Sequence, residues 1–270
     1  MIKKMEPLDV KEGTLNWFRS YLNFRVMLTR VGDVKSDKIT TYNQVSEGSQ
    51  LSSTLFLIQV CDINCYLKHS KSYAFADDQV QSNAHEDIEI ALMQAQEDAN
   101  ITAEYFKQNK FAIQSDKTSM LIIRPSKSKK NQENKKHIIV DGQKIDEIDQ
   151  FKMLGYIIDN KLSNEEHCKY IIKKSRKTLS AIRRLSSKAS KESATKVLKS
   201  VLIGRLAYAG FLYLHNKSQR KRIEIMIMKA VRVVAKKKLS DKIKNSILLK
   251  SLNVCPIETI YKRQTILEVC

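Results

Sequence analysis

The hydrophobic period of the chain changes near residue 160, and this change limits the folds available to it. After Asn160, apolar residues recur every three or four positions, as they do on the buried face of a helix. Before it, short apolar runs alternate with helical stretches, as in an α+β domain. The sequence thus predicts a small antiparallel sheet with packed helices in residues 1–160 and an all-α region in residues 161–270. Helices are expected near residues 164–187, 191–213, 218–236, 241–250 and 256–268.

Net charge separates the same two parts. The chain of 270 residues carries a formal net charge of +19. Residues 161–270 hold 27 Lys or Arg against 7 Asp or Glu, whereas residues 1–160 hold 21 against 22. A basic helical region joined to a near-neutral body favours binding to a polyanion such as nucleic acid. A lysine-rich surface that only keeps the chain soluble is the alternative.

Five cysteines are scattered along the chain: Cys61, Cys65, Cys168, Cys255 and Cys270. Their odd number and the lack of a C-x-x-C pair favour reduced thiols in an intracellular protein, nuclear or cytoplasmic. His167, next to Cys168, has no second pair of ligands at zinc-site spacing, so a zinc site is not expected. No apolar run is long enough for a membrane span, and no secretory signal follows Met1. We expect no membrane partner.

Residues 73–80 place two adjacent carboxylates, Asp77 and Asp78, directly after a short apolar run. Such a run between polar residues predicts a buried strand, and its end would carry the two acids at a turn. A pair of carboxylates favours a nearby divalent metal, because an uncompensated pair is costly. Ordinary turn aspartates are the alternative, and the pair alone does not exclude them.

The residues before the Asp pair predict a helix and a hairpin. The helix would begin near Thr14 and bury Trp17 in a core, which is the usual place for that residue. Residues 24–45 alternate between apolar and polar and predict a hairpin that turns at Gly32-Asp33.

Two further helices are expected on either side of the Asp pair. A turn at Gly48-Ser49 would lead into a helix that ends near Leu67. A helix start after Gly offers free backbone N–H groups to a phosphate or a template backbone, and a capped core helix is the alternative. Residues 85–108 predict a long amphipathic helix, which Asn109 would end.

Strands are expected beyond this helix. Residues 111–123 predict strand structure, and the lysine-rich residues 124–136 predict a surface loop. Residues 138–140 and 151–158 predict two further strands, with a turn at residues 141–142. A strand–helix–strand order of this length is a natural crossover in an α+β sheet.

Five stretches resemble, in order along the chain, motifs of reverse transcriptases from non-LTR retrotransposons. They are residues 17–25 (W-x-x-x-Y-L-x-x-R), 45–56 (V-P-Q-G-S-x-L-S-P-x-L-F), 75–78 (Y/F-A-D-D), 109–118 (N-x-L…K-T) and 151–163 (K-x-L-G-x-x-x-D-x-x-L). The resemblance runs from about residue 10 to at least residue 240. Several motifs in the right order are far more specific than any one of them.

The resemblance implies nucleotidyl transfer by two divalent ions, with Mg²⁺ as the expected cofactor. It implies that Asp77 is a metal ligand, that Asp78 is the supporting carboxylate, and that Lys117 lies near the triphosphate. Residues expected at the template, primer or nucleotide are Phe75, Ala76, Glu47, Gly48, Ser49 and Gly155. Gly155 would belong to a hairpin that grips the primer.

The same resemblance implies a partial fingers and palm in residues 1–160 and a basic thumb in residues 161–270. The expected partners are an RNA template, a DNA primer or RNA–DNA duplex, and a deoxynucleoside triphosphate. Contacts of the basic helices with phosphates would be independent of sequence and sensitive to salt. The sequence implies no protein partner.

The sequence also departs from the family pattern. The family carries a further essential Asp in an F-D-x-x-x-A-F-D-like segment before the W-x-x-x-Y-L helix. This sequence does not contain that segment, and Asp9 lacks its flanks. Glu47 stands where the family has Gln, and Ser46 and Ser53 stand where it has Pro.

These departures lead us to expect a polymerase fragment that is inactive alone. One alternative is a non-catalytic nucleic-acid-binding protein that uses only the basic helices. A second alternative is a chain that does not fold stably, because its sheet is incomplete.

Overall fold

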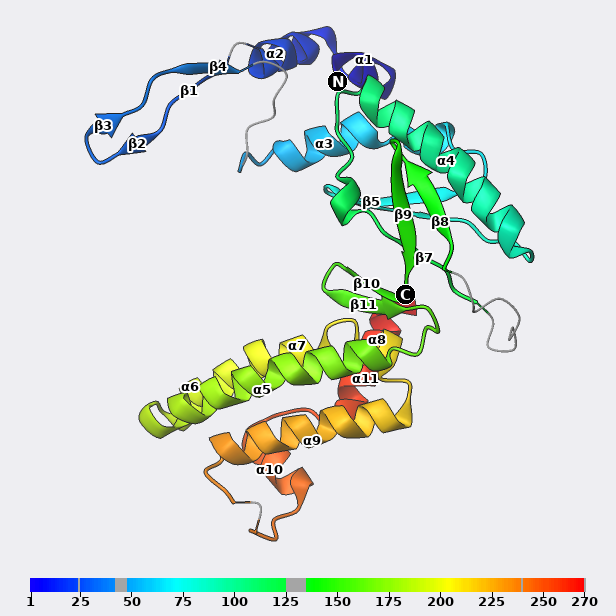
Figure 1. Cartoon of the computed structure of the whole chain (residues 1–270). Helices are drawn as coiled ribbons and strands as arrows, with labels where there is room; N and C mark the ends of the chain where they lie inside the picture. The colour runs from blue at the N-terminus through cyan, green and yellow to red at the C-terminus, as the bar shows by residue number, and fades with distance from the viewer. Residues whose placement is uncertain (24, 42–47, 125–134, 239, 270) are drawn as a thin grey trace. The chain divides into compact units, whose positions relative to one another are not determined.

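Figure 1 shows the computed structural model of the chain, which describes residues 1–23, 25–41, 48–124, 135–238 and 240–269. The described residues form two compact units. The first unit comprises Met1–Met120 and Lys135–Glu147, and the second comprises the remaining described residues. Helices and small antiparallel sheets build the chain, with a helical region at its C-terminal end, which confirms the predicted α+β class.

Three short elements open the first unit: α1 (Ile2–Met5), the 3-10 helix η1 (Glu6–Leu8) and α2 (Glu12–Leu22). Met5 and Leu15 are buried together with Leu55 of a later helix and form a small core. Thr14 does not begin α2 as predicted. It lies within the first turn of the helix, and Lys11 occupies the N-terminal cap position.

The prediction that Trp17 anchors α2 in a core is wrong. Trp17 is 51% exposed, and its ring stacks on that of Tyr21, with 5.1 Å between the ring centroids. Leu15 is the buried residue of α2. Because each residue turns a helix by about 100°, Trp17 points roughly 200° away from Leu15, toward the other side of the helix.

A long hairpin follows α2 and extends away from it (Figure 1). Its strands are β1 (Arg25–Met27), β2 (Arg30–Val31), β3 (Val34–Lys35) and β4 (Ile39–Thr41). β1 pairs with β4, and β2 pairs with β3. Gly32, with a φ of 60°, and Asp33 form the turn. Residues 25–41 thus confirm the predicted hairpin, while residues 24 and 42–45 lie outside the described residues.

The rest of the first unit surrounds the Asp pair. Its elements are α3 (Ser52–Val60), the 3-10 helix η2 (Ile63–Cys65), β5 (Lys71–Phe75), β6 (Asp78–Ser82) and α4 (Ile88–Gln108). α3 ends before Leu67, because the chain turns into η2. α4 confirms the predicted long helix. Asp87 caps α4 by accepting hydrogen bonds from the backbone N–H groups of Glu89 and Ile90.

A three-stranded sheet packs on α4. The 3-10 helix η3 (Ser115–Lys117) leads to β7 (Met120–Leu121), and the other strands are β8 (His137–Val140) and β9 (Gln143–Ile148), in the order β7–β9–β8. Val140 and Ile145 of this sheet bury Ala99 of α4. Asp141 and Gly142 both have positive φ and form the predicted turn. Strand structure in residues 111–123 is limited to β7.

The second unit begins with a hairpin and continues as helices. Its elements are β10 (Gln150–Met153), β11 (Tyr156–Asp159), α5 (Glu165–Lys188), α6 (Lys191–Val197), the π-helix η4 (Leu198–Ile203), α7 (Gly204–Ala207), α8 (Gly210–Tyr213), α9 (Lys217–Val234), α10 (Asn245–Ser251) and α11 (Ile257–Val269). α5 packs along α9, and Ile171, Ile182, Ile223 and Val231 are buried in the core of this unit.

Two predictions for the second unit need correction. Residues 151–158 are not one strand, because Leu154 and Gly155 have φ values of 46° and 84° and form a two-residue turn between β10 and β11. The helix predicted for residues 191–213 is interrupted after Ala207, where Ala209 has a φ of 51°. The helices predicted near residues 164–187, 218–236 and 256–268 are confirmed within two residues at each end, whereas the helix predicted for residues 241–250 begins only at Asn245.

Along the chain, the boundary between the two structural units lies between Glu147 and Ile148, not at residue 160. The hairpin β10–β11 belongs with the helices that follow it, since β11 packs on α5. The assignment of the two parts as palm and thumb remains a prediction. Among the helices that the structure describes, none has both the length and the apolar character needed to span a bilayer.

Candidate active site

The Asp pair lies at the tip of the hairpin β5–β6. Phe75 pairs with Asp78 across the two strands, so Ala76 and Asp77 form the two-residue turn between them. Ala76 has a φ of 52°, which this tight turn requires. Asp77 therefore lies in the turn, Asp78 begins β6, and both side chains are exposed. Four of the predicted site residues therefore lie in or next to one turn: Phe75, Ala76, Asp77 and Asp78.

The prediction that β5 is a buried strand is wrong. Ser72 is its one buried residue, whereas Tyr73 and Phe75 are 57% and 65% exposed. Within the described residues, β5 and β6 form a sheet of two strands. The aromatic side chains therefore have no further strand or helix to cover them, although their apolar run suggested burial.

Asp98 of α4 fixes the segment that leads into β5. Its side chain is fully buried and accepts hydrogen bonds from the backbone N–H groups of Lys68 (2.9 Å), His69 (3.0 Å) and Ser70 (2.6 Å). Burial opposes ionisation of Asp98, but these donors outweigh it and hold the pKa of the carboxyl below its usual value. A carboxylate with three backbone donors makes a rigid base for the hairpin.

Two further polar contacts hold the body of the hairpin. Asn64 of η2 accepts a hydrogen bond from the Ser72 N–H (2.7 Å) and donates one to the Ser72 carbonyl (3.0 Å), as a neighbouring strand would. Gln81 of β6 donates to the hydroxyl of Thr102 on α4 (2.6 Å). The base of the hairpin is therefore fixed while its tip remains exposed.

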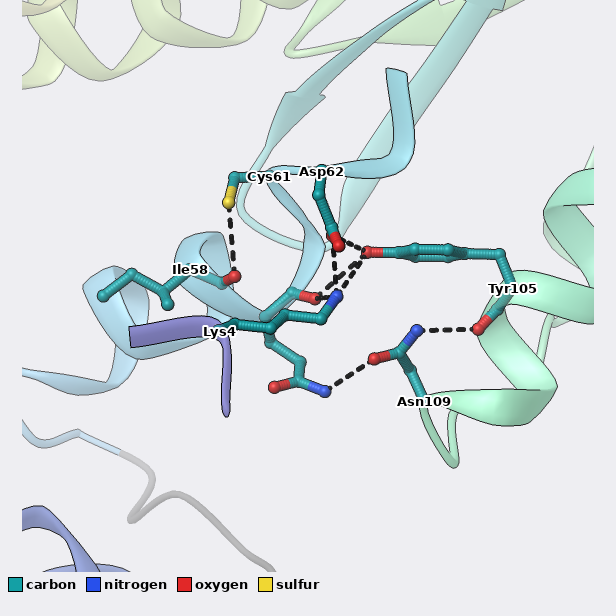
Figure 2. Close-up of polar contacts among 7 residues, drawn as sticks. Lys4, Ile58, Cys61, Asp62, Tyr105 and Asn109 are labelled. Atoms are coloured by element: carbon teal, nitrogen blue, oxygen red, sulfur yellow. Dashed lines mark hydrogen bonds and ion pairs between the residues drawn. The ribbon is translucent and has the colours of Figure 1, made fainter. Parts of the chain in front are cut away.

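A second polar network joins α1 to α3 and α4 (Figure 2). The Lys4 ammonium donates to Asp62 Oδ1 (2.6 Å), to the Gln59 carbonyl (2.6 Å) and to the Tyr105 hydroxyl (2.8 Å). Tyr105 donates its own proton to Asp62 Oδ1 at 2.5 Å. Figure 2 shows the three side chains of Lys4, Asp62 and Tyr105 converging from separate elements.

The network contains an ion pair between Lys4 and Asp62. Burial opposes ionisation of Asp62, yet the hydrogen bonds from Lys4 and Tyr105 outweigh it and lower the pKa of Asp62. Burial, and then the Asp62 carboxylate, raise the pKa of Tyr105. Tyr105 thus stays protonated and donates to a charged Asp62. The network positions α4, the helix that carries Asp98.

The structure also brings together two of the sequence motifs. Tyr21, from the motif at residues 17–25, lies with its hydroxyl 2.8 Å from the hydroxyl of Ser49, from the motif at residues 45–56. The Arg25 guanidinium lies 4.2 Å from the centroid of the Tyr21 ring. The hydrogen bond with Ser49 lowers the pKa of Tyr21, and Arg25 acts in the same direction.

The remaining predicted site residues are dispersed. Gly48, with a φ of 75°, is exposed beside Ser49, and Glu47 lies outside the described residues. Lys117 ends η3 and is exposed, and no described hydrogen bond or ion pair joins it to the Asp pair. Gly155 belongs to the turn of the hairpin β10–β11 in the second unit.

The hairpin β10–β11 is supported by buried groups. Asp159 accepts hydrogen bonds from the N–H groups of Lys161, Ser163 and Asn164 at the start of α5. His167 is fully buried, with its ring 3.9 Å from that of Tyr156, centroid to centroid. Its Nδ1 accepts a hydrogen bond from the Ile157 N–H (3.2 Å), and burial lowers the pKa of His167 to about 4.

The donor set at the first hairpin fits only part of a metal site. Carboxylate oxygens are the hard ligands that Mg²⁺ prefers. A pair of ions, however, needs more anionic ligands than two adjacent side chains provide. Throughout the described part of the chain, no three or more His, Cys, Asp or Glu residues gather where they could hold a metal ion.

The family model described as reverse transcriptase (RNA-dependent DNA polymerase) matches residues 2–158. The chain belongs to the reverse transcriptase family. The match contains the hairpin β5–β6 and extends into β11, ending before the basic helices. No curated protein matches the chain.

The sequence did not reveal the residues that position the reverse transcriptase hairpin. Asp98 lies within a long helix that the sequence predicts from its apolar positions. On the surface of α4, Asp98 lies about 60° from Ala95, at the edge of the apolar side of the helix, so the sequence pattern gives only a weak sign that it is buried. Asp62 and Tyr105 carry no comparable signal, since their partner Lys4 is distant along the chain.

Proposed function

We propose that the chain is part of the RNA-directed DNA polymerase of a non-LTR retrotransposon, with Asp77 and Asp78 as its ligands for Mg²⁺. The observation that carries the proposal is the placement of both carboxylates at the exposed tip of the hairpin β5–β6, inside the reverse transcriptase match. The order of five motifs typical of the non-LTR class supports the finer assignment. An RNA template, a DNA primer and a deoxynucleoside triphosphate are the proposed partners.

We further propose that these 270 residues do not extend a primer by themselves. Nucleotidyl transfer by two metals needs ligands that bridge both ions. Asp77 and Asp78 provide carboxylates on one turn only, and no other acidic side chain of the described residues joins them.

A primer-extension assay tests the proposed inactivity. The purified chain is incubated with a labelled DNA primer on an RNA template, Mg²⁺ and all four deoxynucleoside triphosphates. We expect no extension above that of the variant with Asp77→Asn and Asp78→Asn. An active reverse transcriptase in a parallel reaction shows that the assay works. Extension that depends on Asp77 would contradict the proposed inactivity and support the proposed ligand role.

The charge of the second unit favours a second candidate function, nucleic-acid binding without catalysis. Residues 161–270 carry a net charge of +20, and Lys173, Lys174, Arg176 and Lys177 of α5 are all exposed. Binding through phosphates weakens steeply as salt is added. We expect the dissociation constant for a labelled RNA–DNA duplex, measured by fluorescence anisotropy, to rise with salt. Affinity that does not change with ionic strength would count against this function.

A further inference from the structure

A pocket of about 330 Å³ lies in the second unit, between the π-helix η4 and the last helix, α11. Lys199 and Ile203 of η4 contribute to its lining, and so do Ile260 and Arg263 of α11. Residues 253–255, in the connection between α10 and α11, also line it. Every lining residue belongs to the second unit.

Helical spacing explains why these residues share one pocket. Lys199 and Ile203 are four residues apart on η4, which is close to one turn of the wide π-helix. Ile260 is followed by Arg263 and Gln264 at three and four residues along α11, so their side chains lie on one face of that helix. Each of the two helices therefore presents an isoleucine and a cation together.

A Schellman motif at the end of α10 fixes the connection that enters the pocket. Asn253 has a φ of 49°, and its N–H donates a hydrogen bond to the Lys250 carbonyl (3.0 Å). The Val254 N–H donates to the Leu249 carbonyl (2.9 Å), which completes the motif. Val254 and Leu249 are both buried in the core of the unit. Cys255 follows directly and is half-buried at the pocket.

Gln264 fixes the part of the pocket that α11 forms. Its Nε2 donates a hydrogen bond to the Ala207 carbonyl, at the break between α7 and α8. Its Oε1 occupies the space that a Cβ at Gly210 would need, so α11 packs closely against this glycine. These contacts hold α11 in place whether or not the pocket contains a ligand.

The charge in this pocket has one sign. Lys199 and Arg263 line it, and none of its lining residues is acidic. Among the ion pairs that the described residues form, none includes either of these two cations. Lys199 is half-buried as well. Two cations in one pocket without a counter-charge favour an anionic ligand.

The rest of the lining is mainly apolar. Ile203, Val254 and Ile260 contribute hydrocarbon side chains. Apolar walls with a few charged groups are typical of a small-molecule site, in which the apolar body of the ligand leaves water and the polar groups orient it. An inorganic anion would leave the hydrocarbon side chains uncovered, and a neutral apolar molecule would leave the cations without a partner. The lining therefore fits a ligand that is both anionic and apolar.

We propose that this pocket binds a small carboxylic acid with an apolar body, such as a medium-chain fatty acid, in its ionised form. Arg263 presents a planar fork that suits the two carboxylate oxygens, and Lys199 acts as a point charge. Ile203, Val254 and Ile260 cover the hydrocarbon chain. Such a ligand is no substrate of nucleotidyl transfer, so the inference goes beyond the proposed function.

Cys255 reports whether the pocket is occupied, because a ligand that fills the pocket covers this thiol. The full chain is treated with the neutral disulfide reagent dithiodipyridine, and peptide mass spectrometry follows the labelling of each cysteine separately. Octanoate is the probe ligand. At about ten times its dissociation constant, labelling of Cys255 should slow by about tenfold, since only the free chain reacts. Labelling of the exposed Cys61 should keep its rate.

Octanamide and acetate separate the two features of the ligand. Octanamide has the same hydrocarbon chain without the charge, and acetate has the charge without the chain. Neither should protect Cys255 at concentrations at which octanoate does. Equal protection by octanamide would show that the cations take no part, and equal protection by acetate would show that the apolar walls take none. Either result would overturn the proposal.

Lys199→Met tests the role of the cation. Met keeps an unbranched side chain but removes the ammonium. We expect the affinity for octanoate, measured by protection of Cys255, to fall by about tenfold, as for the loss of one charge-assisted hydrogen bond. The rate of Cys255 labelling without octanoate should not change. Arg263→Met provides a second variant on the other helix, and circular dichroism melting shows whether both variants are folded.

Lys191→Met is the matched control. Lys191 is an exposed lysine at the start of α6 and does not line the pocket, so the variant removes the same charge. It should keep the full protection of Cys255 by octanoate. An equal loss of protection in Lys191→Met and Lys199→Met would show that only the overall charge of the unit matters, and the proposal would fail.

The test is independent of the proposed polymerase. Labelling of Cys255 needs no metal, primer or nucleotide, so a chain without polymerase activity can still show the expected protection. If octanoate does not protect Cys255 but an RNA–DNA duplex does, the pocket contacts nucleic acid and the proposal is wrong. If neither protects it, the proposal is also wrong, and the proposed polymerase function is unaffected.

Discussion

The two hairpins of this chain have similar turns but different supports. Both turn through two residues, with positive φ at Ala76 in one and at Leu154 and Gly155 in the other. The hairpin β5–β6 is held at its base by hydrogen bonds to Asn64, Asp98 and Thr102 and exposes its aromatic side chains. The hairpin β10–β11 also receives polar support, from Asp159 and from His167, but in addition it buries Tyr156 in the core of the helical unit.

This difference predicts how the stability of each hairpin responds to substitutions. A turn held by a few polar side chains depends on each of them, because a backbone donor left without its partner is costly. A turn held by apolar packing is stabilised by many weak contacts, so the loss of any one of them changes its stability less. The first hairpin should therefore be sensitive to single polar substitutions, and the second to burial of charge in its core.

The largest expected effect is at Asp98. Replacing Asp98 by Ala leaves three backbone N–H groups without their acceptor, and we expect the first unit to lose about 3–5 kcal/mol of stability. Urea unfolding followed by the fluorescence of Trp17, the single Trp of the chain, measures this loss. Glu104→Gln is the control, since Glu104 is an exposed acid of the same helix, contacts Gln108 four residues on, and should change little. Equal losses for both variants would contradict the role of Asp98.

Acid should destabilise the second unit through His167. Burial lowers the pKa of His167 to about 4 in the folded chain, whereas its ordinary value is 6.5. Between these values the unfolded chain binds a proton that the folded chain does not. Stability should therefore fall as pH is lowered from 6.5 to 4, by up to about 3 kcal/mol. Far-UV circular dichroism, which reports mainly on the helices, follows this transition.

His167→Phe tests the cause of that pH dependence. Phe keeps a ring against Tyr156 but cannot take up a proton. The variant should be less stable at pH 7, because the Ile157 N–H loses its acceptor, and its stability should change little between pH 6.5 and 4. A pH dependence in this window equal to that of the wild type would show that another group is responsible.

A smaller effect is expected at Tyr105. Tyr105→Phe removes the hydrogen bond that Tyr105 donates to Asp62 and the one that it accepts from Lys4, and it leaves the ion pair between Lys4 and Asp62 in place. We expect the first unit to lose about 1 kcal/mol, measured by Trp17 fluorescence during urea unfolding. Tyr73→Phe, on the exposed face of β5, is the control and should not shift the unfolding midpoint. A midpoint shift as large as that of Tyr105→Phe would show that the Tyr73 hydroxyl also contributes to stability.

The sequence predicted elements that depend on local pattern. The helices α5, α9 and α11 lie where apolar spacing places them. The turns at Gly32 and Gly142 follow from residues that tolerate positive φ. It failed where the outcome depends on tertiary partners. Trp17 is exposed because Leu15 takes the core position of α2, and β5 is exposed because β6 is its sole strand neighbour among the described residues.

The same distinction applies to the candidate site. Asp77 and Asp78 could be located from their motif, because a two-residue turn and its flanking strands are encoded locally. The residues that hold this turn could not, since Asn64, Asp98 and Thr102 reach it from other elements. A side chain that binds backbone groups far away in the sequence can be recognised from the sequence only when it is a polar residue on an otherwise apolar face.

The smallest expected effect on stability is at the tip of the first hairpin, where function is proposed. Asp77 and Asp78 are exposed, and no described ion pair or hydrogen bond of their side chains supports the fold. The double variant with Asp77→Asn and Asp78→Asn should therefore leave the urea midpoint of the first unit unchanged. Removing two adjacent negative charges should also reduce Mn²⁺ binding, measured by electron paramagnetic resonance as the fraction of free ion. An unchanged midpoint with lost metal binding would show that the tip serves binding and not folding. A lowered midpoint would instead show that the two carboxylates stabilise the turn. It would contradict the view that only the base of the hairpin β5–β6 contributes to stability.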